Sequence, residues 1–268
     1  MSTRMGDLWA AGLGLLRYEP TEMRLRASAG GRELVDTVQA VLVWEPRRVV
    51  ASYAVPVAEL RAELAESSVE AVPAPDGILH PGIPFLAHSC PGQVVDVAGL
   101  AGTGFRPDDP ELAEYVVLDF GAIDEWYEED EPLVSHPREP YHRVAVRPSS
   151  RTVRLELDGV LLAESSRPTL VFETNLPTRF YLPREDVVAE LLPSERRSAC
   201  AYKGHARYYS VVGSKDLIWS YPEPLKEVRE LAGLLAFYDD VLDVYVDGKL
   251  REPPTGPIAE SLRQEFGI

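Results

Sequence analysis

The chain has 268 residues, of which 45% are hydrophobic and 26% charged, a composition typical of a globular protein with one large core or two small ones. Its formal net charge of −16 would repel a phosphate backbone, so we expect neither nucleic acid nor an anionic membrane as a partner. The two cysteines, Cys90 and Cys200, are too few for a disulfide framework or a four-cysteine zinc site; with no signal-peptide pattern and no long apolar run, this predicts a cytoplasmic protein.

An internal repeat is the first feature along the chain. Residues 26–45 align with residues 154–173, and after a one-residue gap the similarity continues through residue 64. Ten of these 39 positions are identical, where average composition gives roughly two or three by chance. Further on, residues 112–120 align loosely with 229–237, and His80-Pro81-Gly82 roughly with Tyr202-Lys203-Gly204. Chance similarity between β-rich segments is the alternative, but the recurring order of the blocks favours duplication.

The repeat and the prolines predict four regions. They are a first, degenerate repeat at residues 18–131, a proline-rich connector at 132–148, a second repeat at 149–251 and a C-terminal tail at 252–268.

Short elements are expected in chain order. Short helices are expected at residues 57–64, 109–115 and 225–232. Strands are expected where apolar residues alternate with polar ones or where aromatic and β-branched residues concentrate, at residues 152–158, 160–163, 169–173, 178–182, 206–212 and 241–246. Asp158-Gly159 and Asp247-Gly248 favour hairpin turns. Because long amphipathic helices are missing, the fold class is mainly β and antiparallel, with a few short helices.

Residues typical of binding and catalytic sites concentrate in the second repeat. The candidate catalytic residues are Glu173 and Lys203. The candidate ligand-binding residues of this repeat are Arg179, Tyr181, Arg184, Tyr202, Tyr208 and Trp219. If residues 178–182 form a strand, Arg179 and Tyr181 lie on one face of it, because side chains alternate along a strand. Such a face combines apolar bodies with directional polar groups, which suits a ligand site.

Each candidate also has a structural interpretation. Glu173 ends an apolar strand and is either an acid or base whose pKa is raised by burial or a structural partner of Arg179 or Arg184. The two arginines bind a carboxylate or phosphate, or they balance the charge of nearby acids. Lys203 is either a nucleophile or base whose pKa is lowered by neighbouring tyrosines, or a solvated lysine in a turn.

The first repeat keeps less of this pattern. It retains Glu45, with Arg48 nearby, and both are candidate ligand-binding residues, while the lysine and one arginine of the pattern are lost. The connector adds His136 and Arg138 as candidate ligand-binding residues. His136 and His142 are conceivable as a metal pair, but hydrogen bonding between the repeats is the favoured interpretation, and no metal or cofactor is expected.

The ordered motifs of the second repeat carry a family resemblance. They are E-T-N-L-P-T-R-F-Y-L-P-R-E-D-V (residues 173–187), C-A-Y-K-G-H-A-R-Y-Y-S (200–210), W-S-Y-P (219–222) and A-F-Y (236–238). Together they resemble the bacterial family called domain of unknown function 427. The first half resembles the truncated repeat of the family's tandem members, through motifs that include V-L-V-W-E-P-R-R-V-V-A-S-Y-A-V-P (41–56) and H-P-R-E-P-Y-H-R (136–143).

The resemblance implies a strongly bent antiparallel sheet, the β-tent, present twice. It implies no activity, although the family is sometimes labelled nucleotidyltransferase-like. Many β-tent relatives bind zinc through paired C-x-x-C motifs; this chain has none, so a zinc site of that kind is not expected.

The sequence favours a small-molecule site in a concavity of the second repeat. Arg179, Arg184 and Lys203 would hold an anionic or polar metabolite, and Glu173 would serve as acid or base in chemistry that needs no redox cofactor. One alternative is a non-catalytic binding or interaction module whose ion pairs are structural. A weaker alternative is nucleotidyl transfer, which needs a carboxylate-held Mg²⁺. The sequence assigns no oligomeric state and does not decide whether the protein is an enzyme.

Overall fold

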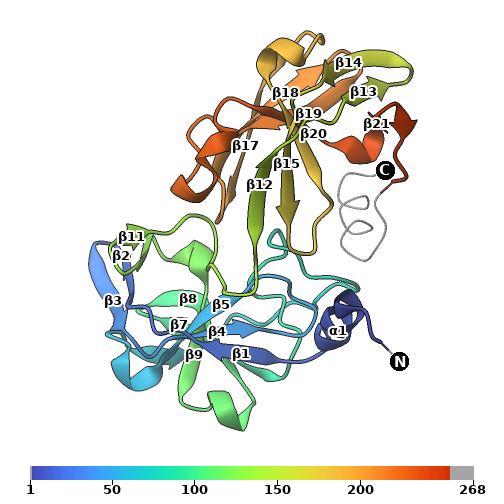
Figure 1. The fold of residues 1–268 in the computed structure, drawn as a ribbon. Coiled ribbons are helices and arrows are strands. Elements are labelled where there is room, and N and C mark those ends of the chain that lie inside the picture. Colours follow the sequence, from blue (N-terminus) through green and yellow to red (C-terminus); the bar gives the residue numbers. More distant parts are fainter. Residues whose placement is uncertain (1, 254–268) are drawn as a thin grey trace. The chain divides into compact units, whose positions relative to one another are not determined.

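The structure, a computed structural model, describes residues 2–253 and divides into two compact units, Met1–Glu139 and Pro140–Ile268 (Figure 1). Each unit contains a seven-stranded and a four-stranded sheet, and their paired strands run antiparallel. The expected fold class, mainly β with a few short helices, is confirmed. The predicted C-terminal tail lies outside the described residues from residue 254 onward.

The N-terminal unit begins with the α-helix α1 (Met5–Gly12), which the sequence analysis did not predict. In spatial order, its seven-stranded sheet consists of β1 (Arg17–Pro20), β4 (Val41–Trp44), β5 (Ser52–Pro56), β9 (Tyr115–Leu118), β8 (Leu100–Pro107), β7 (Gly92–Val97) and β6 (Leu64–Glu66). Its four-stranded sheet consists of β11 (Glu131–Pro132), β10 (Glu125–Glu128), β2 (Leu25–Ala29) and β3 (Arg32–Thr37). Its 3-10 helices are η1 (Val57–Glu59), η2 (Pro110–Leu112) and η3 (Phe120–Ala122).

The C-terminal unit has the same strand order. Its seven-stranded sheet consists of β12 (Val144–Pro148), β15 (Thr169–Glu173), β16 (Arg179–Leu182), β20 (Leu235–Phe237), β19 (Ser214–Ser220), β18 (Gly204–Val211) and β17 (Leu192–Cys200). Its four-stranded sheet consists of β14 (Val160–Ser165), β13 (Val153–Leu157), β21 (Asp243–Val246) and β22 (Lys249–Leu250). Its 3-10 helices are η4 (Arg184–Asp186), η5 (Lys226–Leu231) and η6 (Asp239–Val241).

The strand registers also agree between the units. Val41 pairs with Ala54 as Thr169 pairs with Tyr181, so Glu45 and Glu173 follow equivalent strands at equivalent positions. At the other end of the sheet, Phe105 pairs with Val117 as Trp219 pairs with Ala236. The pairs Gln93–Arg106 and Arg207–Ser220 continue this correspondence onto β7 and β18.

These registers correct two of the sequence alignments. Residues 116–118 correspond to 235–237, two positions later than the alignment predicted. His88-Ser89-Cys90, not His80-Pro81-Gly82, precedes β7 in the place of Tyr202-Lys203-Gly204. Residues 67–91 are mostly irregular, so a sequence alignment does not fix which residues of the two units correspond there. The registers of the adjoining strands β7 and β18 do fix it.

The main core of each unit lies between its two sheets. In the C-terminal unit, Val153 and Leu155 of the four-stranded sheet pack with Leu170, Phe180 and Leu182 of the seven-stranded sheet. The N-terminal unit packs Leu25, Leu34, Leu42 and Val55 in the same way. Tyr181, between Phe180 and Leu182 in β16, belongs to a second cluster on the opposite face of the sheet, as the alternation along a strand requires.

The two predicted hairpin turns are present, and the predicted helices at residues 57–64 and 109–115 are shorter than expected. Asp158 and Asp247 take positive φ angles of 51° and 52° before their glycines, as tight hairpin turns demand. The helix predicted at residues 57–64 is the single 3-10 turn η1, because the chain returns to an extended conformation at Leu60. Within the helix predicted at 109–115, the Asp109 side chain caps η2 by accepting a hydrogen bond from the Glu111 backbone N–H.

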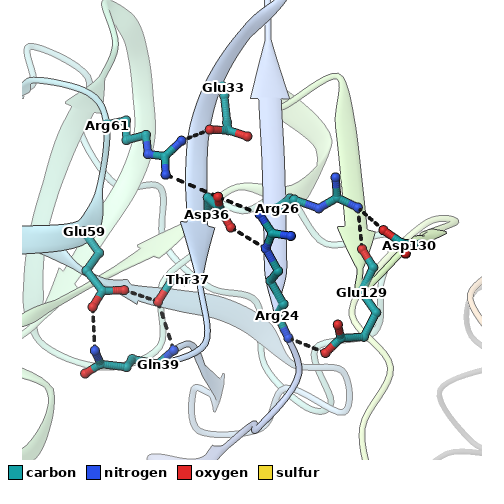
Figure 2. Close-up of polar contacts among 10 residues, drawn as sticks. All are labelled: Arg24, Arg26, Glu33, Asp36, Thr37, Gln39, Glu59, Arg61, Glu129 and Asp130. Carbon is teal, nitrogen blue, oxygen red and sulfur yellow. Dashed lines mark hydrogen bonds and ion pairs between the residues drawn. The ribbon is translucent and has the colours of Figure 1, made fainter.

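Ion pairs and hydrogen bonds link the exposed side chains of the N-terminal four-stranded sheet (Figure 2). At one end of this network, the Thr37 hydroxyl bonds to the Glu59 carboxylate and accepts the Gln39 backbone N–H at 2.9 Å (Figure 2). Thr37 ends β3 and Glu59 ends η1, which follows β5, so this contact fastens one sheet to the other. Exposed ion pairs elsewhere in the network add little stability each.

The C-terminal unit contains an equivalent contact. The Ser165 hydroxyl, at the end of β14, donates to the Asp186 carboxylate at 2.6 Å and accepts the Arg167 backbone N–H at 3.1 Å. The Arg167 side chain also pairs with Glu185 and Asp186. The acids of the 184–186 segment are therefore neutralised by Arg167.

We expect Ser165→Ala to lower the free energy of unfolding by about 1 kcal/mol, because the partly buried Asp186 carboxylate loses a hydrogen-bond donor. Urea unfolding measures this change. Val212→Ala is the control, since Val212 is 81% exposed, and it should change stability by less than about 0.5 kcal/mol. Equal losses in the two variants would contradict a role for the contact.

Candidate functional site

A buried polar cluster is built around Glu173, the last residue of β15. One carboxylate oxygen accepts a hydrogen bond from His142 Nε2 at 3.0 Å, and the other bonds to the Lys203 ammonium. Lys203 is 7% exposed, and its side chain comes from the turn between β17 and β18. The His142 ring stacks on Tyr202 with 4.3 Å between centroids. The cluster thus unites residues that are about 30 positions apart in both directions along the chain.

The ion pair fixes the charges of both candidate catalytic residues. Burial raises the pKa of Glu173, but the charge of Lys203 and hydrogen bonds from His142 and Lys203 outweigh burial and lower this pKa to about 2. Burial likewise lowers the pKa of Lys203, but the Glu173 carboxylate outweighs it and raises this pKa above its usual value. Both pKa shifts run opposite to those that the catalytic interpretation requires. The partner of Glu173 is Lys203, whereas the structural interpretation expected Arg179 or Arg184.

Aromatic residues with polar tips form a wall on the same face of the sheet. Trp219 Nε1 donates to the Tyr181 hydroxyl at 3.1 Å, and the two rings are nearly perpendicular. The Tyr208 hydroxyl lies 2.8 Å from the Ser198 hydroxyl, and the Tyr208 ring stacks on Tyr238. Burial is the largest cause that raises the pKa of Tyr181, to about 12, so its hydroxyl stays protonated. The wall therefore presents neutral hydrogen-bonding groups on flat apolar bodies.

The two candidate arginines have different surroundings. The Arg179 guanidinium lies 5.9 Å from the centre of the Trp219 ring and forms ion pairs with Asp239 and Asp240, so it joins the wall with its charge neutralised. Arg184 is exposed, and its guanidinium donates to the backbone carbonyl of Val187 at 3.0 Å. Val187 packs in the core between the sheets, so Arg184 is not brought to the Glu173 cluster.

A shallow hollow of about 190 Å³ borders this cluster. It is lined by Arg143, Phe172, Glu173, Thr174, Leu176 and Thr178. Two hydrogen bonds hold its rim, from the Arg143 N–H to the Thr174 side-chain hydroxyl at 2.8 Å and from the Thr174 N–H to the Arg143 carbonyl at 3.0 Å. Among residues 2–253, no ion pair or hydrogen bond engages the Arg143 guanidinium. The hollow therefore has an unpaired positive charge at its rim.

Sequence reasoning missed two residues of this site. His142 was assigned to hydrogen bonding between the repeats, yet it bonds to Glu173 within the C-terminal unit. Arg143 was not selected at all. Both belong to the motif H-P-R-E-P-Y-H-R, and the pairing of Val144 with Glu173 brings the end of this motif to the cluster.

The connector residues His136 and Arg138 lie in the N-terminal unit. His136 Nδ1 is 2.8 Å from the carbonyl of Pro137, and Arg138 pairs with Glu131 at 3.4 Å. Their assignment to a ligand site stays a prediction.

The N-terminal unit has its own buried carboxylate at the position equivalent to Glu173. Glu45 accepts hydrogen bonds from the Ser89 backbone N–H at 2.7 Å and lies 2.9 Å from His88 Nδ1, with Arg48 at 3.6 Å. The Arg48 guanidinium also donates to three backbone carbonyls between residues 84 and 87. Burial raises the pKa of Glu45, but the bond to His88 and the other contacts lower it overall. The cluster therefore holds the irregular segment of residues 84–89 in place.

The two faces of the seven-stranded sheet differ between the units to different degrees. On the core face, Leu170, Phe180, Leu182 and Leu235 correspond to Leu42, Tyr53, Val55 and Val116. On the opposite face, Tyr181, Tyr208, Trp219 and Tyr238 correspond to Ala54, Val94, Phe105 and Asp119. The polar tips are thus confined to the C-terminal unit.

No group of three or more His, Cys, Asp or Glu within residues 2–253 is arranged to hold a metal ion. In the same part of the chain, no helix has the length and hydrophobicity needed to cross a membrane.

The charge of Glu173 predicts a pH dependence of stability. Because its pKa falls from a usual 4.5 to about 2 on folding, its contribution is complete above the usual value and is lost as the pH falls toward 2. Between pH 6 and pH 2, we expect the free energy of unfolding to fall further in the wild-type protein than in the Glu173→Gln variant. The expected difference between the two losses is roughly 2–3 kcal/mol. Denaturant unfolding at several pH values measures the difference, and parallel curves would contradict the buried ion pair.

One family model matches part of the chain. Residues 145–248 match the model of the family described as Domain of unknown function (DUF427). No curated protein matches the chain. The match begins one residue into β12 and ends in the turn before β22, so it covers nearly all strands of the C-terminal unit. Residues 145–248 of this chain are therefore similar to the DUF427 family.

Proposed function

We propose that the C-terminal unit binds a small, negatively charged polar molecule at the hollow beside Glu173. The observation that carries this proposal is the unpaired Arg143 guanidinium at the rim of a hollow whose remaining charges are already balanced. Glu173 and Lys203 cancel each other, so an incoming anion meets the charge of Arg143 and the hydroxyl of Thr178. Guanidinium groups favour carboxylate and phosphate because their paired donors match the geometry of these anions.

The divergence between the units supports a function on this face of the C-terminal sheet. Selection for folding alone acts on both core faces, and these stay apolar in both units. Ala54, Val94 and Phe105 occupy the places of Tyr181, Tyr208 and Trp219 in the same fold, so the fold does not require the polar tips. We infer that the first repeat is a degenerate copy that lost the site and kept the scaffold.

Binding is favoured over covalent catalysis by Lys203. A nucleophilic amine has to be neutral, but the Glu173 carboxylate keeps Lys203 protonated. With a pKa of about 2, Glu173 is a weak base. In this proposal the pair supports the wall of the hollow, and any acid–base step falls to His142, which contacts Glu173 at 3.0 Å.

The alternative is a non-catalytic interaction module in which these ion pairs are structural. The neutralisation of Arg179 by two aspartates favours it, because that arginine has no charge to offer a ligand. Nucleotidyl transfer is a third possibility and requires a divalent cation with a triphosphate.

The test is a thermal-shift screen of inorganic phosphate, citrate, sugar phosphates, nucleotides and amino acids. A ligand that binds only the folded state raises the melting temperature. We expect an anion to raise it, and Arg143→Gln to weaken its binding about ten-fold, since charge-assisted hydrogen bonds contribute roughly 1.5–3 kcal/mol.

Arg147→Gln is the matched control. Arg147 lies on β12, four residues after Arg143, is exposed and donates to the neighbouring Val146 carbonyl. Equal weakening in both variants would assign the effect to general charge and contradict the site. No shift with any anion, together with a co-purifying protein, would favour the interaction module, and triphosphate binding that requires Mg²⁺ would favour nucleotidyl transfer.

A further inference from the structure

The hollow beside Glu173 has an apolar side that an anion alone does not use. Phe172 lines it and is 42% exposed, and Leu176, in the turn between β15 and β16, is exposed as well. Because side chains alternate along β15, Phe172 lies on the same face as Leu170, which packs in the main core. The apolar core face of the sheet therefore continues into the hollow and ends there at a half-exposed aromatic ring.

The equivalent aromatic residue of the N-terminal unit is covered. Trp44 corresponds to Phe172, but it is 6% exposed and belongs to the main core of its unit. Opposite Trp44 on β1 is Arg17, whose guanidinium donates to two backbone carbonyls at 3.3 and 2.9 Å. Opposite Phe172 on β12 is Ala145. Opposite residues of an antiparallel pair lie side by side on one face, so a long side chain flanks Trp44, whereas only a methyl group flanks Phe172.

Polar groups at the hollow differ between the units in the same way. Arg143 and Thr178 line the hollow together with Phe172. The strand registers place Leu15 and Ala51 at the equivalent positions of the N-terminal unit, and these residues carry neither a charge nor a hydroxyl. The guanidinium, the hydroxyl and the exposed ring are thus combined at this place in the C-terminal unit but not in the N-terminal unit.

We propose that the ligand of the hollow is a single planar ring that carries one carboxylate or phosphate group. Its anionic group contacts Arg143, and in this respect the inference rests on the proposed function; its ring packs against Phe172 and Leu176. Aromatic rings in contact gain stability beyond that of the apolar area they bury. The hollow of about 190 Å³ is smaller than the roughly 300–1,000 Å³ of sites for drug-sized ligands, so one ring fits it better than a whole nucleotide.

The probes are matched anions with and without a ring. Benzoate has a flat ring, cyclohexanecarboxylate a puckered ring of similar size, and acetate none; phenyl phosphate and methyl phosphate form the corresponding pair of phosphates. NMR titration of the isotope-labelled full chain measures each dissociation constant and follows the amides of Thr174 and Thr178 at the hollow. We expect the ring to strengthen binding at least about five-fold in the series of the preferred anion, and benzoate to exceed cyclohexanecarboxylate about two-fold, because a flat ring stacks on Phe172.

Substitutions at Phe172 separate the ring from the anion. Phe172→Ser should remove the advantage of benzoate over acetate and leave acetate within about two-fold, whereas Arg143→Gln should weaken both ligands alike. Phe172→Leu keeps an apolar side chain, so it should remove the preference for a flat over a puckered ring. Val188→Ser is the control, because Val188 is 63% exposed in the same unit but does not line the hollow, and it should change neither ligand.

The outcomes distinguish this inference from the anion site itself. A ring that adds no affinity, an advantage that survives Phe172→Ser, or an equal loss in Val188→Ser would overturn the inference while acetate or methyl phosphate still binds through Arg143. If none of the five probes binds, the anion site is absent and the inference fails with it.

Discussion

A carboxylate buried at the end of the strand next to one edge of the seven-stranded sheet is the constraint around which each unit is arranged. Removing such a charge from water costs several kcal/mol unless cations and hydrogen-bond donors surround it. Glu173 meets this requirement with Lys203 and His142, and Glu45 meets it with Arg48, His88 and the Ser89 N–H. Because the partners come from turns and connecting segments, the carboxylate fixes segments that strand pairing alone leaves undetermined.

The two units solve this problem with different residues at equivalent places. Ser89 stands where Lys203 stands, so the N-terminal unit uses a backbone N–H and takes its cation from Arg48 instead. The strand order and the core between the sheets are unchanged by this exchange. Folding therefore needs the carboxylate to be paired but does not specify its partner. Residues on the face of the seven-stranded sheet that points away from the main core are therefore free to change.

This freedom explains why the C-terminal unit combines a rigid interior with a site at its rim. The charges of Glu173 and Lys203 are fixed by each other, and the aromatic wall is bonded internally through Trp219 and Tyr181. The hollow lined by Arg143 contains none of these aromatic residues and adjoins the buried cluster through Glu173. There the positive charge of Arg143 attracts anions to an otherwise acidic protein.

The sequence by itself determined the fold class, the hairpins at Asp158-Gly159 and Asp247-Gly248, the DUF427 relationship and the equivalence of Glu45 with Glu173. These follow from the alternation of apolar and polar residues, from the Asp-Gly turn signals and from residue identities in an alignment. All of them can be found along the chain without knowing which side chains meet in space.

Only the tertiary structure decided which residues meet. It paired Glu173 with Lys203 and so reversed the pKa shifts that the catalytic interpretation requires, separated Arg184 from the cluster, and brought in His142 through the pairing of β12 with β15. The physical reason is that the state of a buried charge depends on its spatial neighbours, and these come from distant segments whose register is set by strand pairing.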